Sequence, residues 1–249
     1  MILLRDNAAR AKQIISIFWI MLGLTITNMG ALAWRYFLLT DVQNNPDNID
    51  MTMINASDTL IIVVNIAHIL IVILTIVFFI MWFRRAYYNL HMLPWNNARY
   101  TEGWAAGSWF VPIINFWWPY QIMMDIWRGT QYALKERLGE PRSAAIVGWW
   151  WALHLLTTFY NNISARIGWD AEQDIDSLLT STKVDFIGEI LSIPAIIFTI
   201  ILIQRTSSFE RELMIQAETP ADSIFSEHYT PPQDDTDAKI ITGITEPKI

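Results

Sequence analysis

The chain has 249 residues, of which 53% are hydrophobic and only 16% are charged, whereas soluble domains carry roughly 25% charged residues. Its formal net charge of -7 argues against a nucleic-acid partner, which requires a basic surface. The lack of cysteine excludes disulfides, thiolate nucleophiles and iron–sulfur clusters. The composition therefore predicts an all-α integral membrane protein, with the lipid bilayer as its first partner and with no bound cofactor.

Four stretches are long and apolar enough to cross a membrane, because a hydrocarbon core of about 30 Å takes about 20 helical residues. We expect four transmembrane helices at residues 14–39, 59–83, 143–165 and 184–203. Residues 1–13 are expected to form a cytoplasmic N-terminus. The first stretch is predicted to be an uncleaved anchor, because no small-residue cleavage site follows it.

A fifth apolar stretch, residues 104–127, is rich in tryptophan and differs from the others. Pro112 and Pro119 each remove a backbone donor and disturb the preceding helical turn. Asn115 lies between them and can bond to carbonyl groups that the breaks set free. One straight spanning helix is therefore not expected. Two alternatives remain, a kinked span and a segment that enters the membrane and returns.

The placement of lysine and arginine favours the second alternative. The connections at residues 40–57 and 166–183 are acidic, which places them outside, whereas those at residues 84–99 and 128–142 are basic, which places them inside. Both flanks of the broken stretch then lie on the cytoplasmic side. We expect a re-entrant or interfacial helical hairpin between the second and third spans, and cytoplasmic N- and C-termini.

The second half of this hairpin carries a polar face, because Gln121, Asp125 and Arg128 recur at helical spacing after Pro119. An amphipathic helix at the inner interface accounts for this face, and a water-filled cavity is the alternative. As a functional site, Asn115, Gln121, Asp125 and Arg128 would bind a polar solute or an anion. As a packing device, Asp125 and Arg128 would form a pair three residues apart. In that case Gly103 and Gly107 would let a neighbouring helix approach.

The same region carries a family resemblance. The residues concerned are Gly103-Trp104-Ala105, Gly107-Ser108-Trp109-Phe110, Pro112-Ile113, Asn115, Trp117, Pro119-Tyr120-Gln121, Met123 and Asp125-Ile126-Trp127-Arg128, flanked by Arg85-Ala86-Tyr87, Asn89-Leu90, Arg99 and Gly148-Trp149-Trp150-Trp151-Ala152. Over about residues 61–203 this pattern resembles the bacterial membrane family called domain of unknown function 4328. The resemblance implies a bacterial multi-pass protein, which we expect in the inner membrane, and it implies no established chemistry.

Ionisable residues inside predicted spans are functional candidates, and His68, His154 and Glu189 are considered as such. His68 and His154 are each ten residues from the outer end of their span, so they are candidate axial ligands of a b-type haem. Hydrogen bonding between neutral groups on adjacent helices is the alternative. Glu189 is either a buried proton or cation site or a group that reaches water at the outer interface. The conceivable partners of a buried Glu189 are Asn161, Asn162 and Arg166.

Residues 204–249 are rich in proline and acidic residues, which predicts a largely disordered cytoplasmic tail. The sequence carries no linear signature of a hydrolase, so no enzyme is expected. The leading hypothesis is a non-enzymatic scaffold or sensor that contacts other membrane or cytoplasmic proteins through the hairpin and the tail. A transporter or channel subunit with its polar site at the broken hairpin is the alternative, and an intramembrane haem protein is a third.

Overall fold

A computed structural model describes residues 4–47, 50–94, 98–170 and 174–218, and over these residues the chain is helical without strands. The long helices are α1 (Ala8–Asn44), α2 (Met51–His91), α6 (Ala145–Asp170) and α7 (Ile175–Glu218). The short ones are α3 (Trp104–Gly107), the 3₁₀ turn η1 (Ile114–Phe116), α4 (Trp118–Ala133) and α5 (Lys135–Leu138). The all-α prediction is confirmed.

Three of these helices are long and apolar enough to cross a membrane, namely α1, α2 and residues 175–217 of α7. Helix α6 has 26 residues but is not one of them, because three consecutive tryptophans and several asparagine, histidine and threonine residues lower its hydropathy. The spanning role predicted for residues 143–165 therefore stays a prediction. The other three helices extend beyond the predicted spans at both ends.

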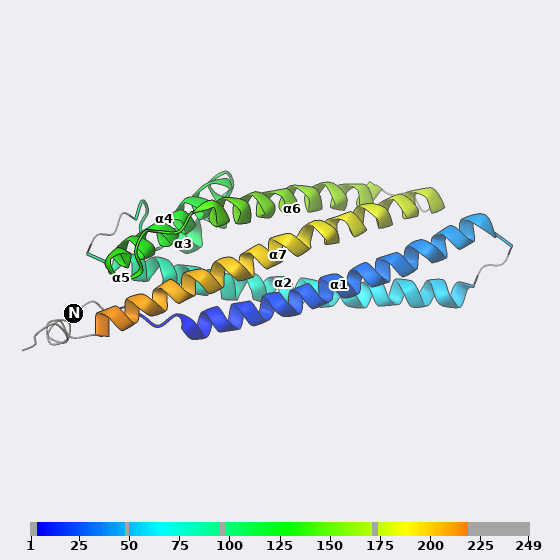
Figure 1. Cartoon of the computed structure of the whole chain (residues 1–249). Coiled ribbons are helices and arrows are strands. Elements are labelled where there is room, and N and C mark those ends of the chain that lie inside the picture. The colour runs from blue at the N-terminus through cyan, green and yellow to red at the C-terminus, as the bar shows by residue number, and fades with distance from the viewer. Residues whose placement is uncertain (1–3, 48–49, 95–97, 171–173, 219–249) are drawn as a thin grey trace, which may run out of the picture.

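The long helices lie side by side in alternating directions (Figure 1). Helix α1 packs on both α2 and α7, and α7 also packs on α6. The short helices α3, α4 and α5 all lie at the end of the bundle where α1 begins and α7 ends (Figure 1). The connection from α2 to α6 thus leaves and rejoins the bundle at one end, as the charge pattern predicts for residues 104–127.

The hydrophobic core lies at this same end of the bundle. Helix α2 contributes Trp82, Phe83 and Tyr87, each fully buried, and α4 contributes a matching buried face. That face consists of Ile122, Met123, Ile126 and Trp127. In its middle, by contrast, α2 exposes a long row of isoleucine, leucine and valine side chains, which is a surface suited to lipid rather than to water.

Helix α4 begins with Pro119 in its first turn, as the sequence predicts. It ends at Ala133, and Leu134 separates it from α5. The polar face that starts at Gln121 therefore stays within α4 and does not continue to Lys135.

Helix α7 continues well past residue 203, where the sequence analysis expected the tail to begin. Phe209 and Leu213 are buried on its inner face, and the ring of Phe209 lies 5.4 Å from that of Trp127, edge to face. These apolar contacts extend the ordered helix to Glu218. The rest of the predicted tail, residues 219–249, lies outside the described residues.

We predict that Trp127→Ala destabilises the protein by about 3–5 kcal/mol, because removing a fully buried indole leaves a cavity between α4 and α7. Thermal unfolding in detergent measures the effect. Tyr132→Ala is the matched control, since this ring on the same helix is 62% exposed. Equal losses in the two variants would contradict the assignment of the core to this face of α4.

Candidate functional site

Asp125 is the most buried charged group of the hairpin, with only 7% of its side chain exposed. The backbone N–H of Arg99 donates to its Oδ2 over 3.1 Å, and Nε of Arg99 lies 3.3 Å from Oδ1. Burial raises the pKa of Asp125 above its ordinary value, although the hydrogen bond and the charge of Arg99 act in the opposite direction. Asp125 thus attaches the connection between α2 and α3 to the middle of α4.

Tyr100 makes a second attachment next to it. Its hydroxyl donates to Oε1 of Gln121, and its ring stacks on Trp118 with centroids 4.1 Å apart. Tyr87 on α2 donates its hydroxyl to the Tyr100 carbonyl and accepts from the Tyr100 N–H, both over 3.0 Å. His91 lies 3.0 Å from the same carbonyl through Nε2. The segment is therefore bonded to α2 on one side and to α4 on the other.

The four residues predicted as one polar site are not all brought together. Gln121 and Asp125 meet through the segment that contains Arg99. Arg128, expected to pair with Asp125, is instead exposed, and the ion pair of Asp125 is made with Arg99. Asn115 lies apart in η1, where its Oδ1 is buried without a partner among the described residues. Periodicity placed three of these residues on one face but did not show which side chain each would meet.

The tip of the hairpin, residues 110–117, lies against α6. The indole N–H of Trp151 donates to the Phe116 carbonyl over 3.2 Å, and the ring of Phe116 stacks on Phe159 at 5.8 Å. The tip turns at Ile113, whose φ of 70° is a strained conformation for a β-branched residue. The tip also exposes apolar side chains, namely those of Phe110, Pro112, Ile113, Phe116 and Trp117.

Among the described residues, no neighbouring helix comes within contact of a Cβ placed at Gly103 or Gly107, the two glycines predicted to admit one. A Cβ added at Gly103 would have no atom within 4 Å, and one at Gly107 would only reach the ring of Trp104 at 3.5 Å. Neither position needs glycine for close helix packing, so that prediction is wrong. Gly129 is the tight contact, because a Cβ there would lie 2.4 Å from Cδ1 of Leu90 on α2.

A buried carboxylate that the sequence analysis missed joins α7 to α2 and the N-terminal segment. Glu210 is 6% exposed and accepts from Nδ2 of Asn7 over 3.1 Å and from Nδ2 of Asn89 over 3.1 Å. Asn89 also exchanges two hydrogen bonds of 2.9 Å with the backbone of Arg5. The sequence analysis placed Glu210 in the tail. The signal that could have found it is the helical spacing of Thr206, Glu210 and Leu213, with Phe209 beside them.

A second polar cluster lies in the apolar part of the bundle. Nδ2 of Asn28 on α1 donates to Oε1 of Glu189 on α7 over 2.7 Å, and Nδ1 of His68 on α2 lies 4.0 Å from the same oxygen. The partners of Glu189 are therefore on α1 and α2 and not on the third predicted span. Each member lies 21 residues from a member of the other cluster along the chain. Asn28 follows Asn7, which immediately precedes α1, whereas His68 precedes Asn89 on α2 and Glu189 precedes Glu210 on α7.

The two histidines do not share a site. His68 faces Glu189, whereas the ring of His154 lies among Trp109, Trp150 and Trp151 at 5.1–6.4 Å. A haem with these residues as its two axial ligands does not fit this arrangement.

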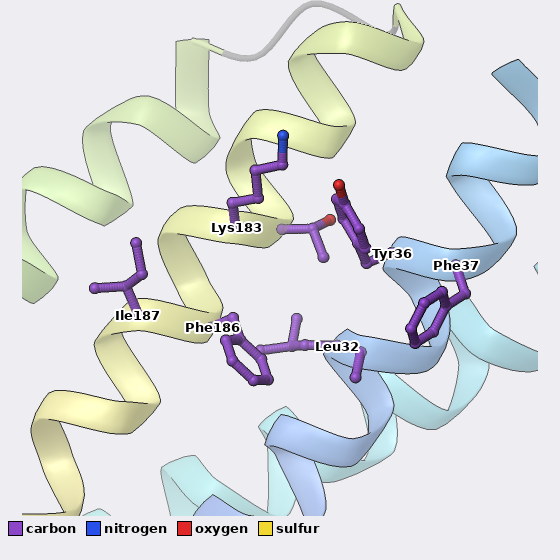
Figure 2. A pocket seen from close by; sticks show the side chains of 8 residues that line it. Leu32, Tyr36, Phe37, Lys183, Phe186 and Ile187 are labelled. Carbon is purple, nitrogen blue, oxygen red and sulfur yellow. The ribbon is translucent and has the colours of Figure 1, made fainter.

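An apolar pocket of about 460 Å³ lies between α1 and α7, on the outer side of the Asn28–Glu189 hydrogen bond. Figure 2 shows Leu32 and Phe186 in this pocket, one helical turn from Asn28 and Glu189 respectively, with Lys183 and Tyr36 at its outer end. Nζ of Lys183 lies 5.4 Å from the centre of the Tyr36 ring. The lining of the pocket is almost entirely apolar, which suits a lipid chain.

The family model for domain of unknown function 4328 (DUF4328) matches residues 45–208, which include the hairpin and its attachments. The chain belongs to this family. No curated protein and no solved structure matches it. The match includes α2 and α6, whereas all of α1 precedes it, so the DUF4328 segment contains His68 and Glu189 but not Asn28.

We predict that Asp125→Leu destabilises the DUF4328 hairpin by about 2 kcal/mol, because the partly buried N–H of Arg99 loses its acceptor and its guanidinium loses its ion pair. Asp125→Asn retains an acceptor oxygen of the same shape, so its loss should be less than about 1 kcal/mol. Thermal unfolding of both variants gives the comparison. An equal loss in the leucine and asparagine variants would show that the hydrogen bond to Arg99 does not hold the segment.

A comparison of the wild type with Asp125→Asn yields a prediction on the pH dependence of stability. Because the folded pKa of Asp125 lies above its unfolded value, the folded state binds this proton more readily. The contribution of Asp125 to stability is therefore fully present below the ordinary carboxyl pKa and is lost as the pH rises through the folded pKa. Compared with Asp125→Asn, the wild type should gain stability as the pH falls through this window. A difference that stays constant with pH would contradict the prediction.

Proposed function

We propose that this DUF4328 protein is a non-enzymatic scaffold or sensor of the bacterial inner membrane, which presents a fixed cytoplasmic face to other proteins. The proposal rests on one observation, which is that polar side chains of the hairpin make their hydrogen bonds and ion pair within the chain. Gln121 and Asp125 are bound to Tyr100 and Arg99 of the same chain, so these two side chains hold a structure together, which favours a structural role over the binding of a solute.

The proposal includes four spans, with α6 as the third in chain order. At 1.5 Å per residue its 26 residues reach about 39 Å, enough for a bilayer core. Residues 145–165 carry no Asp, Glu, Lys or Arg. The helix packs along α7, and it exposes Trp149, Leu156, Phe159 and Ile163 on its other side. An exposed apolar side of this kind supports contact with lipid.

The charges at the two ends of the bundle support cytoplasmic termini. The end that carries the hairpin also carries Arg10, Arg84 and Arg85, while Asp41 and Asp176 lie at the other end. Arginine and lysine accumulate on the cytoplasmic side of membrane proteins. With this orientation the hairpin, the start of α1 and the end of α7 all face the cytoplasm.

The hairpin tip then lies in the inner leaflet as a shallow re-entrant segment. Trp109 contacts Phe79 on α2 at 5.5 Å, and Phe79 is five residues, or about 7 Å, deeper in the bundle than Arg84. The exposed rings of Phe110 and Trp117 suit the interfacial region of a bilayer. Partner proteins would meet the remaining exposed side of α4, around Arg128, together with the tail.

A transporter or channel subunit is the second candidate, and one observation favours it. Oδ1 of Asn115 is buried and has no donor among the described residues, which is the state expected of a group that awaits a polar solute or water. Water at Asn115 distinguishes this candidate from the first.

Single cysteines in this cysteine-free chain test the proposal. A membrane-impermeant maleimide should label Arg128→Cys only in inside-out vesicles and Asp41→Cys only in intact cells. Ile113→Cys should remain unlabelled from both sides until detergent is added, because its side chain, 82% exposed in the protein, would be covered by lipid.

Two results would count against the proposal. Labelling of Arg128→Cys and Asp41→Cys from the same side would exclude the topology. Rapid labelling of Asn115→Cys from the cytoplasm, with Ile113→Cys protected, would reveal a wet cavity and favour the transporter or channel subunit.

A further inference from the structure

The cluster of Asn28, His68 and Glu189 lies well inside the apolar part of the bundle. His68 is ten residues from Asp58 at the outer end, and Glu189 is sixteen residues from Arg205 at the inner end. At 1.5 Å per residue these separations are about 15 Å and about 24 Å. A bare carboxylate at such a depth is costly unless it is neutralised, and ionisable groups there usually mark a site of function.

The cluster leaves buried oxygen atoms without donors. Oε1 of Glu189 accepts from Asn28, but Oε2 of Glu189 and Oδ1 of Asn28 have no partner among the described residues. Thr25, three residues before Asn28 on α1, is fully buried, and its Oγ1 is also without a described partner. A proton bound to Glu189 would supply the missing donor. It would neutralise the carboxylate and turn one of its acceptor oxygens into a donor to a neighbouring oxygen.

The other titratable groups on α6 and α7 are engaged elsewhere. Asp185, one turn from Glu189, accepts from Oγ of Ser164 over 2.7 Å at an exposed position. Tyr160 donates its hydroxyl to the Val184 carbonyl over 2.7 Å. Lys183 lies over the ring of Tyr36 at the outer end of the apolar pocket (Figure 2).

On α1 and α2 the nearest charges also have partners. Arg35 lies 3.6 Å from Asp58, and this ion pair joins the outer parts of the two helices. His68 is therefore the one titratable side chain that the described structure places at contact distance from Glu189. Its side chain is 20% exposed, so it is the member of the cluster with the most access to the outside.

His68 lies at an open depression on the surface of α2, whose lining is Asn65, His68, Ile69, Val72 and Ile73. His68 belongs to this lining and also faces Glu189, so its two ring nitrogens are suited to take up a proton on one side and release one on the other.

We propose that Asn28, His68 and Glu189 form a proton-binding site within the membrane part of the bundle, loaded through His68. In the loading step an N–H bond of the His68 imidazolium breaks and an O–H bond forms on the Glu189 carboxyl group. The products are a neutral imidazole and a neutral carboxylic acid. Asn28 holds the carboxyl group in place through its Nδ2. This site goes beyond the scaffold or sensor role and does not depend on the hairpin.

Infrared difference spectroscopy over a pH series, on the full chain in phosphatidylcholine nanodiscs, tests the site. The wild type should show the C=O band of a protonated carboxyl group, and this band should disappear as the pH rises. Glu189→Gln should remove the component of the band that belongs to Glu189 and leave that of other buried acids such as Glu210, whereas Asp185→Asn, which removes an exposed acid from the same helix, should retain the Glu189 component. Persistence of the whole band in Glu189→Gln, or no protonated carboxyl in the wild type at any pH at which it is folded, would overturn the proposal.

The role of His68 has its own test in the same experiment. His68→Gln should slow the appearance of the Glu189 band after a rapid drop in pH, because the carboxylate loses its proton donor. His154→Gln, which removes a histidine from the tryptophan cluster on α6, should leave this rate unchanged. An unchanged rate in His68→Gln would exclude loading through His68. Because this comparison uses Glu189 itself, it stays decisive even if Glu189→Gln does not fold.

Discussion

The long helices of this protein exceed the thickness of a bilayer, and the excess length of α2 and α7 carries large apolar side chains among its polar ones. Helix α2, with 41 residues, is about 61 Å long, against a hydrocarbon core of about 30 Å. Its last turns carry Trp82, Tyr87 and Leu90, and the end of α7 carries Phe209 and Leu213. Large apolar side chains must be buried by protein where lipid does not reach them. The short helices between α2 and α6 bury them, and for this reason the core lies at one end of the bundle.

The short helices between α2 and α6 are not stable on their own. Helix α4 has 16 residues, and isolated helices of that length are marginal in water. Its apolar face supplies most of the binding to α2 and α7, and its polar groups determine where it sits. Asp125 and Gln121 reach the same short segment, around Arg99 and Tyr100, which α2 holds from the other side. In this arrangement a charged residue at the centre of the hairpin serves to position a helix.

Much of this fold follows from one-dimensional patterns. Hydropathy located the four long helices, and the alternation of acidic and basic connections placed both flanks of the broken stretch at one end. The sequence patterns did not show which residues, far apart in the chain, pair with one another. Asp125 meets Arg99, 26 residues earlier, and Glu210 meets Asn7, 203 residues earlier. The composition of the tail also hid the ordered end of α7, because Phe209 and Leu213 become core residues only once Trp127 lies against them.

The two buried carboxylates tie together the same three helices. Glu189 and Glu210 lie 21 residues apart on α7, and their partners on α1 and α2 keep the same spacing. This interval is three heptads, so in a left-handed bundle both clusters fall on one face of each helix, about 32 Å apart along the axis. Sliding or rotation of α7 against α1 would strain both sets of hydrogen bonds at once, because both clusters join the same three helices. The outer cluster contains the titratable pair, and the inner cluster holds the segment through Arg5 and Asn7 against α2. A change in the charge of Glu189 would therefore act on helices whose other ends hold the hairpin and the N-terminal segment in place.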